Sequence, residues 1–373
     1  MERPLIKIHM SEDITMYKIM KYMPEGNVRF FGRTIFDKSS NATFFNWSGS
    51  GFVFRFCGTK AECFLSGGLK NEDIPQKETR GYIGVYLDDI PYCIARFPID
   101  KVEGLYTLAE NLPFGEHVIY VVKETEVANG RTALQYLVLD GEILSPPEEA
   151  KIKIEFIGDS ITCGYGNICS NASPEFVTAE ENFSQTYAAV AARLLNAEVS
   201  VIAASGNGFF HDYGCNTHNL IPELYYYTDK FFDGHRGCEP QKWDFEKDHR
   251  DIVVVKLGQN DFQYCGGADL PTEQRTEDVL NARREEFCNV ATAFLKEISR
   301  LRPDTPIIMI YESDMRLKNE IITAVNRADC GIYTMEIMPK REYEGVGANG
   351  HFSVYTHTRV GMLLAERIKE IIC

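Results

Sequence analysis

The segment Ile152-Lys-Ile-Glu-Phe-Ile-Gly-Asp-Ser-Ile-Thr-Cys-Gly-Tyr-Gly166 carries the strongest structural signal in the chain. Its first half is a short apolar, β-branched run between charged flanks, as expected of a buried strand. The run ends at Gly158-Asp159-Ser160, so a hydroxyl group follows directly on the strand. Ligands bind at the carboxyl ends of strands in open α/β sheets, and a serine there is a nucleophile if a base and oxyanion donors converge on it. Alone, the tripeptide is a weak signal, because it also forms ordinary turns.

Three later segments supply further polar residues in similar positions. Gly206 follows the apolar run Glu198–Ile202, and Asn260 follows the run Asp251–Leu257. His351 comes shortly before a predicted C-terminal helix. Three of the four residues, Ser160, Gly206 and Asn260, thus come just after predicted strands.

This order of serine, glycine, asparagine and histidine resembles the SGNH, or GDSL-type, hydrolases over about residues 150–373. The resemblance implies that Ser160 is the nucleophile and His351 the general base. It also implies an oxyanion hole formed by the Ser160 N–H, the Gly206 N–H and the Asn260 side-chain amide. A capping serine and a turn asparagine are the ordinary alternatives at Ser160 and Asn260.

Composition limits the partners. The chain has 373 residues, enough for about two domains, and 44% of them are hydrophobic. The formal net charge of −15 argues against nucleic acid and anionic membranes, which attract basic surfaces, whereas a neutral, hydroxyl-rich substrate is compatible with it. Met1–His9 has no continuous apolar run, and the eleven cysteines lack CxxC spacing, as in reduced proteins. We therefore expect a cytoplasmic protein, with no membrane partner and with a homo-oligomer left open.

The two parts of the chain differ in pattern. Residues 1–148 are predicted to form an all-β sandwich, because short alternating strands recur between turn residues. From 149 to 373, strands alternate with helices, which predicts a three-layer α/β/α domain with a parallel sheet. The strands of the first part are expected at 51–56, 61–65, 82–87, 92–96, 117–124 and 135–140. The helices of the second part are expected at 184–195, 276–301, 317–327 and 356–372.

Further motifs resemble carbohydrate esterase family 2, whose members carry an N-terminal jelly-roll domain. They are Gly32-Arg33, Trp47–Ser50, Phe52–Phe56, Pro222–Tyr225, Trp243–Phe245 and Gly347–His357. The resemblance implies a cofactor-free acetyl xylan esterase that removes O-acetyl groups from xylo-, manno- or gluco-oligosaccharides. Two alternatives stay open: a short-chain lipid or thioester hydrolase of the SGNH superfamily, and a carbohydrate-binding protein with a decayed site.

The histidine block departs from both family patterns. Many SGNH enzymes have an aspartate three residues before the histidine, where this chain has Ala348, and family 2 members often have an acid where it has Asn349. We expect a Ser–His dyad in which a backbone carbonyl orients His351, with Asn349 in a supporting role and the third triad role unassigned. Gly350 replaces a common aromatic, which removes one expected sugar contact.

Two nearby residues have other expected roles. Asp159 is predicted to brace its own loop by accepting backbone N–H groups rather than to react. His357 is the rival base, but a predicted helix carries it away from Ser160, so His351 is preferred.

Residues 209–249 form an irregular insertion rich in aromatic residues, of which we expect roughly a third to line a sugar-binding cleft. The insertion also contains histidines and cysteines in a spacing that permits a zinc site. That spacing is not a standard finger pattern and serine chemistry needs no metal, so no metal site is predicted. The aromatic residues are Phe209, Phe210, Tyr213, Tyr225, Tyr226, Tyr227, Phe231, Phe232 and Trp243; the possible ligands are His211, Cys215, His218, His235 and Cys238.

Overall fold

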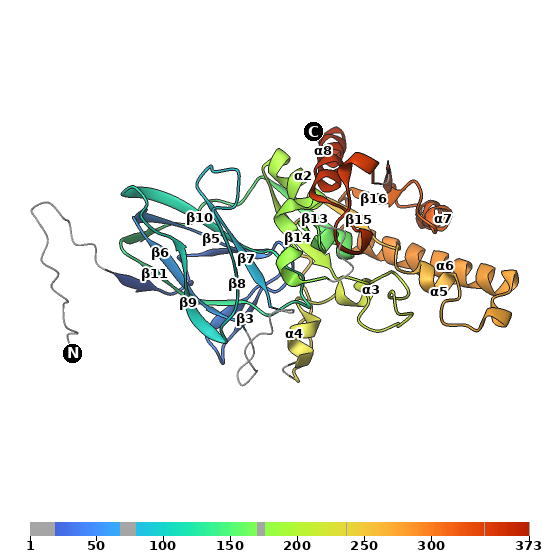
Figure 1. The fold of residues 1–373 in the computed structure, drawn as a ribbon, viewed down its shortest axis with the longest axis horizontal. Helices are drawn as coiled ribbons and strands as arrows, with labels where there is room; N and C mark the ends of the chain where they lie inside the picture. The colour runs from blue at the N-terminus through green and yellow to red at the C-terminus, as the bar shows by residue number, and fades with distance from the viewer. Residues whose placement is uncertain (1–18, 68–79, 170–175, 236, 339, 373) are drawn as a thin grey trace, which may run out of the picture.

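A computed structural model describes residues 19–67, 80–169, 176–235, 237–338 and 340–372. The stretch Met1–His9, on which the expectation of no leader depends, lies outside them. A β-sandwich and an α/β body lie side by side (Figure 1). Among the described helices, none has the length and apolar character needed to cross a membrane.

The sandwich consists of two antiparallel sheets. One has the order β3 (Ile35–Asp37), β4 (Ala42–Phe44), β11 (Ala133–Leu139), β6 (Ala61–Ser66) and β9 (Glu103–Ala109), with β1 (Met20–Tyr22) beside β11. The other has the order β12 (Glu142–Leu144), β5 (Gly51–Gly58), β10 (Gly115–Lys123), β7 (Tyr82–Leu87) and β8 (Ala95–Pro98), with β2 (Arg29–Phe31) beside β5. The predicted all-β architecture of this part is confirmed.

The alternation of β5 explains the sandwich core. Phe52, Phe54 and Phe56 are fully buried between the sheets, whereas Arg55 between them is partly exposed. Side chains two residues apart point to the same face of a strand, so the three rings form one inward row. Their ring centroids lie 6.3 and 5.9 Å apart along the strand.

The second part is built on a five-stranded, wholly parallel sheet. The apolar run after Ile152 and the runs Glu198–Ile202 and Asp251–Leu257 each form one of its strands, as predicted. The strand order is β14 (Ala197–Ala203), β13 (Ile152–Gly158), β15 (Ile252–Lys256), β16 (Ile307–Glu312) and β17 (Tyr333–Ile337). All carboxyl ends therefore lie at one edge, with the loops after β14 and β15 flanking the loop after β13.

Helices cover both faces of this sheet. One face packs against α2 (Tyr187–Leu195) and α8 (Val354–Ile372), and the other packs against α6 (Glu277–Leu301) and α7 (Lys318–Ala328). The predicted three-layer arrangement is thus confirmed. The short helices are α1 (Ser160–Cys163), α3 (Ile221–Leu224), α4 (Lys230–His235) and α5 (Phe262–Cys265). Single 3-10 turns are η1 (Thr178–Glu180), η2 (Phe183–Gln185), η3 (Thr272–Gln274), η4 (Glu342–Glu344) and η5 (Ala348–Gly350).

The long helix α6 shows why the sequence forms a helix here. The Thr276 side chain caps it by accepting the Val279 N–H, and Glu277 and Asp278 place negative charge in its first turn, where the helix dipole favours it. Its inward face buries Phe287, Phe294 and Ile298 among others. Val279, in the first turn, is 37% exposed.

The interface between the two parts is buried and polar. Arg33 of the sandwich is 1% exposed; its guanidinium forms an ion pair with Glu155 of β13 at 3.2 Å. The same group donates to the carbonyls of Tyr225 and Tyr227 at 2.6 and 2.7 Å. The Trp47 indole N–H donates to the Thr228 carbonyl at 2.8 Å. The 225–228 segment of the insertion is therefore a docking strip for the sandwich.

Candidate active site

Ser160 lies where β13 ends and α1 begins. Asp159 is the N-cap of α1, and its Oδ1 accepts the Ile161 N–H at 3.0 Å. This side chain is buried, and burial raises the pKa of Asp159. Asp159 thus braces the turn, the role that the sequence predicts for it, and the turn presents the Ser160 hydroxyl at the carboxyl edge of the sheet.

His351 lies directly against Ser160. Its Nε2 is 2.9 Å from the Ser160 Oγ, and its Nδ1 is 3.0 Å from the Ala348 carbonyl oxygen. A carbonyl only accepts, so Nδ1 carries the proton and Nε2 is free to accept from the serine hydroxyl. A backbone carbonyl therefore holds the histidine tautomer, at the position where the sequence lacks a carboxylate.

Burial and nearby cations keep His351 neutral. Desolvation lowers the pKa of His351, and Lys340 and Lys256 lower it further, whereas the Ala348 carbonyl and Glu312 raise it. Lys256, at the end of β15, is itself paired with Glu312 of β16 at 3.2 Å. The net effect favours the unprotonated ring that a general base requires.

Asn349 does not reach His351. It adopts a left-handed backbone conformation with φ of 50°, and its Nδ2 donates to the Tyr165 hydroxyl at 2.9 Å. The Tyr165 ring packs on His351 with a centroid separation of 4.4 Å. Asn349 is therefore linked to His351 through Tyr165, a residue near the site that the sequence analysis missed; its place in Gly164-Tyr165-Gly166 was the available signal.

Gly166 brings the nucleophile loop against the histidine loop. It has a positive φ of 56°, and a Cβ there would lie 2.2 Å from the Ala348 Cβ. The Gly166 carbonyl accepts the Ala348 N–H at 3.0 Å. A side chain at 166 would separate the two loops, so glycine is required for the approach of His351 to Ser160.

The loops after β14 and β15 carry the expected oxyanion donors. The Gly206 N–H has no acceptor among the described residues, and its φ of 76° lies in the region that favours glycine. One N–H of the Asn260 amide donates to the Asn207 carbonyl at 2.7 Å, which ties Asn260 to the Gly206 loop. The other amide N–H has no acceptor within the part of the chain that the structure describes. Because β14 and β15 flank β13, the two donors lie on either side of the Ser160 turn.

His357 lies apart from the nucleophile. It is 1% exposed on α8, and its Nδ1 accepts the Tyr187 N–H at 3.1 Å. Burial lowers the pKa of His357 to about 3. It is a neutral core histidine, and the rival base role has no support in the structure.

Three aromatic residues of the insertion belong to the buried core. Phe209, Tyr225 and Phe232 are buried, and Phe232 packs on Phe44 of the sandwich with ring centroids 4.2 Å apart. Tyr213 is 59% exposed, and its N–H donates to the Gly206 carbonyl at 2.7 Å, beside the candidate oxyanion donor. How many of these aromatic residues line a cleft stays a prediction.

Asp261 anchors the start of the insertion, a role that the sequence analysis did not assign. Its carboxylate accepts the backbone N–H groups of Phe209, Phe210 and His211 at 2.8–3.0 Å. Burial raises the pKa of Asp261 to about 6. The His211 ring stacks on Tyr264 at 3.5 Å.

The possible zinc ligands do not gather. Within the described part of the chain, His211, Cys215, His218 and Cys238 belong to no group of metal-ligating atoms; the His235 side chain lies outside that part. The described side chains that do gather are Glu126, Cys163 and Glu181, which are buried.

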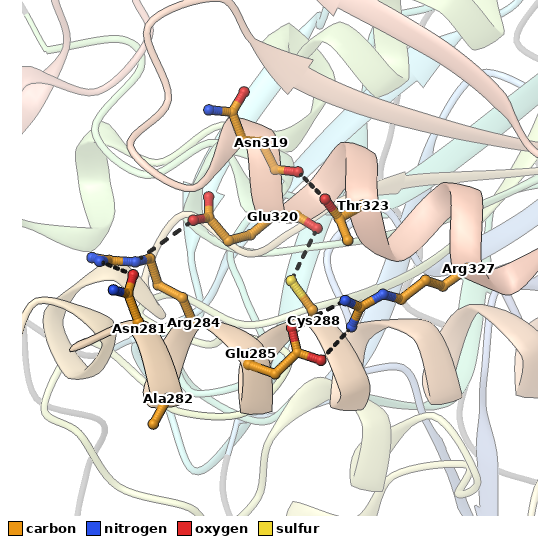
Figure 2. A pocket seen from close by; sticks show the side chains of 9 residues that line it. All are labelled: Asn281, Ala282, Arg284, Glu285, Cys288, Asn319, Glu320, Thr323 and Arg327. Carbon is orange, nitrogen blue, oxygen red and sulfur yellow. Dashed lines mark hydrogen bonds and ion pairs between the residues drawn. The ribbon is translucent and has the colours of Figure 1, made fainter. Parts of the chain in front are cut away.

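A cavity of about 580 Å³ lies between α6 and α7 (Figure 2). Ion pairs cross it, Arg327 with Glu285 at 2.7 Å and Arg284 with Glu320 at 3.9 Å. Its residues come from the outer helices and not from the strand ends, so it is separate from the Ser160 site. The lining residues are Asn281, Ala282, Arg284, Glu285, Cys288, Asn319, Glu320, Thr323 and Arg327.

Comparisons with known proteins agree with this architecture. The Cellulase/esterase CelE of Acetivibrio thermocellus is 30% identical over 335 residues, which are 86% of this chain and 36% of that protein. An Acetylxylan esterase / glucomannan deacetylase of Cellvibrio japonicus is 24% identical over 285 residues, 76% of this chain and 70% of that one. The chain thus spans about a third of CelE's length.

A solved structure is also similar. It is a family two carbohydrate esterase from Clostridium thermocellum in complex with cellohexaose, with a TM-score of 0.77 and 27% identity over 92% of this chain and 98% of that chain. Residues 30–147 match the carbohydrate esterase 2 N-terminal model, and residues 154–364 match the GDSL-like Lipase/Acylhydrolase model. The chain therefore belongs to the GDSL-like lipase/acylhydrolase family, with a carbohydrate esterase 2 N-terminal match directly before the region that this family model covers.

Proposed function

We propose that this protein is a serine esterase that removes O-acetyl groups from carbohydrates. The observation that carries the proposal is the 2.9 Å separation between the His351 Nε2 and the Ser160 Oγ, with the histidine held in the productive tautomer by the Ala348 carbonyl. A nucleophile and base within hydrogen-bond distance, the base being oriented by a third group, are the requirements of covalent acyl transfer.

The reaction follows from this geometry. The Ser160 oxygen attacks the acetyl carbonyl carbon while its proton passes to the His351 Nε2. The oxyanion accepts hydrogen bonds from the Ser160 N–H, the Gly206 N–H and the Asn260 amide. When the intermediate collapses, His351 gives its proton to the departing sugar oxygen and an acetyl ester remains on Ser160. Water, deprotonated by His351, then releases acetate and restores the serine.

The substrate class comes from the relatives. Their names describe carbohydrate esterases, an acetylxylan esterase and a glucomannan deacetylase, and one structure holds cellohexaose. We extend this class to the present chain: acetylated xylo-, manno- or gluco-oligosaccharides are the proposed substrates. The exposed Tyr213 ring beside Gly206 supports a sugar-facing surface there.

The test measures acetate release from acetylated xylo-oligosaccharides by the wild type, Ser160→Ala and His351→Ala. We expect release by the wild type and a loss of 10³-fold or more in each variant, since the dyad acts as a unit. A comparison of p-nitrophenyl acetate with a p-nitrophenyl octanoate probes the acyl site. Faster cleavage of the long ester would favour a lipid hydrolase, and a wild type that cleaves neither ester nor sugar acetate would refute the esterase assignment.

A further inference from the structure

A loop of the sandwich, residues 124–129, contacts the segments that carry the candidate active site. It follows β10 at the side of the sandwich that faces β14 and β13 (Figure 1). Val127 of this loop is buried in the same hydrophobic core as Ile157 and Ile202 of the parallel sheet. Glu126 is 4% exposed. A side chain from the sandwich is therefore part of the interior of the α/β body.

The Glu126 carboxylate contacts both loops on which the proposed chemistry depends. Its Oε2 accepts the Ser205 N–H at 2.7 Å, one residue before Gly206. The same oxygen lies 3.9 Å from the Cys163 Sγ, in the last position of helix α1, which begins at Ser160. A short bond from an N–H to a carboxylate is stronger and more directional than a neutral one. It is well suited to hold a peptide plane in one orientation.

The loop that presents Glu126 is itself fixed by a buried cation. The Lys123 ammonium is fully buried and donates to the carbonyls of Asn46, Thr125, Glu126 and Asn129 at 3.0–3.2 Å. Burial lowers the pKa of Lys123 to about 8, and the nearby carboxylates of Glu181 and Glu126 oppose this shift. Three of its four acceptors lie within the loop, which makes Lys123 an internal clamp on the backbone of 125–129.

A metal site is the competing interpretation of this cluster. Ligand atoms of Glu126, Cys163 and Glu181 lie within 4.8 Å of one another. However, the Lys123 ammonium already acts on Glu126 and Glu181 as the local positive charge, and burial raises the pKa of the Cys163 thiol well above its ordinary value. A protonated thiol beside an ammonium is a poor metal site. The hydrogen bond to Ser205 is left as the specific contact that Glu126 makes with the site.

We propose that Glu126 is a positioning residue for the oxyanion hole: by accepting the Ser205 N–H, it holds the Ala204–Ser205 peptide and so sets the direction of the adjoining peptide, which presents the Gly206 N–H to the substrate. The inference rests on the proposed esterase function. The sandwich would then complete the active site, because its loop 124–129, held by Lys123, supplies the acceptor for the Ser205 N–H. Loss of the acceptor would free the Ala204–Ser205 peptide and let the adjoining Gly206 N–H change direction, which weakens the oxyanion donor without touching Ser160 or His351.

The test uses variants of the whole chain that change the length and the charge of the residue 126 side chain separately. Glu126→Gln retains an acceptor of the right length without charge, whereas Glu126→Asp retains the charge but withdraws it by about 1.5 Å. We expect Glu126→Asp and Glu126→Ala to lower kcat on p-nitrophenyl acetate roughly 10- to 100-fold with little change in KM, and Glu126→Gln to retain most of kcat. The upper limit is set by the ~10²- to 10³-fold effect of removing a whole oxyanion donor.

Glu124→Ala is the matched control. Glu124 is equally buried at the same interface, but it accepts the Ser184 N–H and hydroxyl at 2.9 and 2.8 Å, on η2 rather than on the oxyanion loop. It is expected to lower stability with little effect on kcat per folded molecule. Equal losses of kcat in Glu124→Ala and Glu126→Ala, or a Glu126→Asp variant as active as Glu126→Gln, would overturn the proposal.

Amide hydrogen exchange gives a readout that does not depend on the reaction. Exchange across residues 204–208 is expected to accelerate in Glu126→Asp and Glu126→Ala but not in Glu126→Gln or Glu124→Ala. Unchanged exchange in Glu126→Ala would refute the positioning role whatever the protein hydrolyses. If the variants show the expected exchange rates but the wild type has no esterase activity, only the proposed function is refuted.

Discussion

Replacement of Asn349 tests whether a backbone carbonyl suffices to orient His351. The Asn349 side chain makes its hydrogen bond to the Tyr165 hydroxyl, while the His351 Nδ1 faces the Ala348 carbonyl at 3.0 Å. Glycine is the appropriate substitute, because residue 349 has a positive φ of 50° that alanine adopts only with strain. Asn349→Gly therefore removes the side chain and leaves the backbone carbonyl in place.

The size of the loss in kcat/KM distinguishes a contact with Tyr165 from a direct role of Asn349 in holding the His351 tautomer. A neutral hydrogen bond contributes about 0.5–1.5 kcal/mol, and about 1.4 kcal/mol corresponds to a tenfold change in rate. If the whole Asn349–Tyr165 bond were transmitted to the transition state, kcat/KM would fall by roughly tenfold at most. Loss of a triad acid that holds the histidine tautomer costs about 10⁴-fold. We therefore expect Asn349→Gly to lose less than about tenfold.

The assay is kcat/KM for p-nitrophenyl acetate, with His351→Ala as the control that loses the base itself. Asn349→Asp supplies a second test, because its carboxylate would face Tyr165 and should not raise activity. A loss of about 10³-fold or more in Asn349→Gly would refute the reasoning, since a solvent-facing bond to Tyr165 cannot account for it. A large gain in Asn349→Asp would also contradict the dyad, because it would mean that residue 349 reaches the imidazole.

Two further predictions concern pH and the interface. Because burial lowers the pKa of His351, the base form is present above that pKa; kcat/KM should be constant above pH 6.5 and fall only at lower pH, and an apparent pKa above 6.5 would contradict this. Arg33→Met should lower the free energy of unfolding in urea by about 3 kcal/mol, the lower end for a broken buried ion pair because Arg302 still contacts Glu155 at 3.0 Å. Arg367→Met, which removes an exposed pair with Glu370, should cost less than about 1 kcal/mol, and equal losses would refute a structural role for Arg33.

The sequence alone was sufficient for the parallel sheet and its loops. Buried strands are continuous apolar runs, such as Ile252–Lys256, and the glycine and polar residues that end them are local signals. It was insufficient for the shorter strands of the sandwich. The strands β1 to β4 have three residues each, too few to show a period. The seven-residue β9 alternates exposed and buried positions but was not predicted.

The sequence by itself determined which residue types follow the strands, namely the hydroxyl of Ser160, the flexible Gly206 and the amide of Asn260, and it placed the imidazole of His351 before the last helix. The motifs also predicted the family, which the comparisons confirm. These features are either local in the sequence or follow the order of motifs known for the family, so they can be recognised without a structure.

Only the tertiary structure decided what surrounds those residues. A backbone carbonyl such as that of Ala348 has no sequence signature, because every residue has one, and only the left-handed turn at Asn349 brings it to the imidazole. The contacts Glu126–Ser205 and Arg33–Glu155 join residues 79 and 122 positions apart in the chain. Such contacts depend on how the sandwich docks on the sheet, and no local pattern encodes a docking geometry between two separately patterned parts.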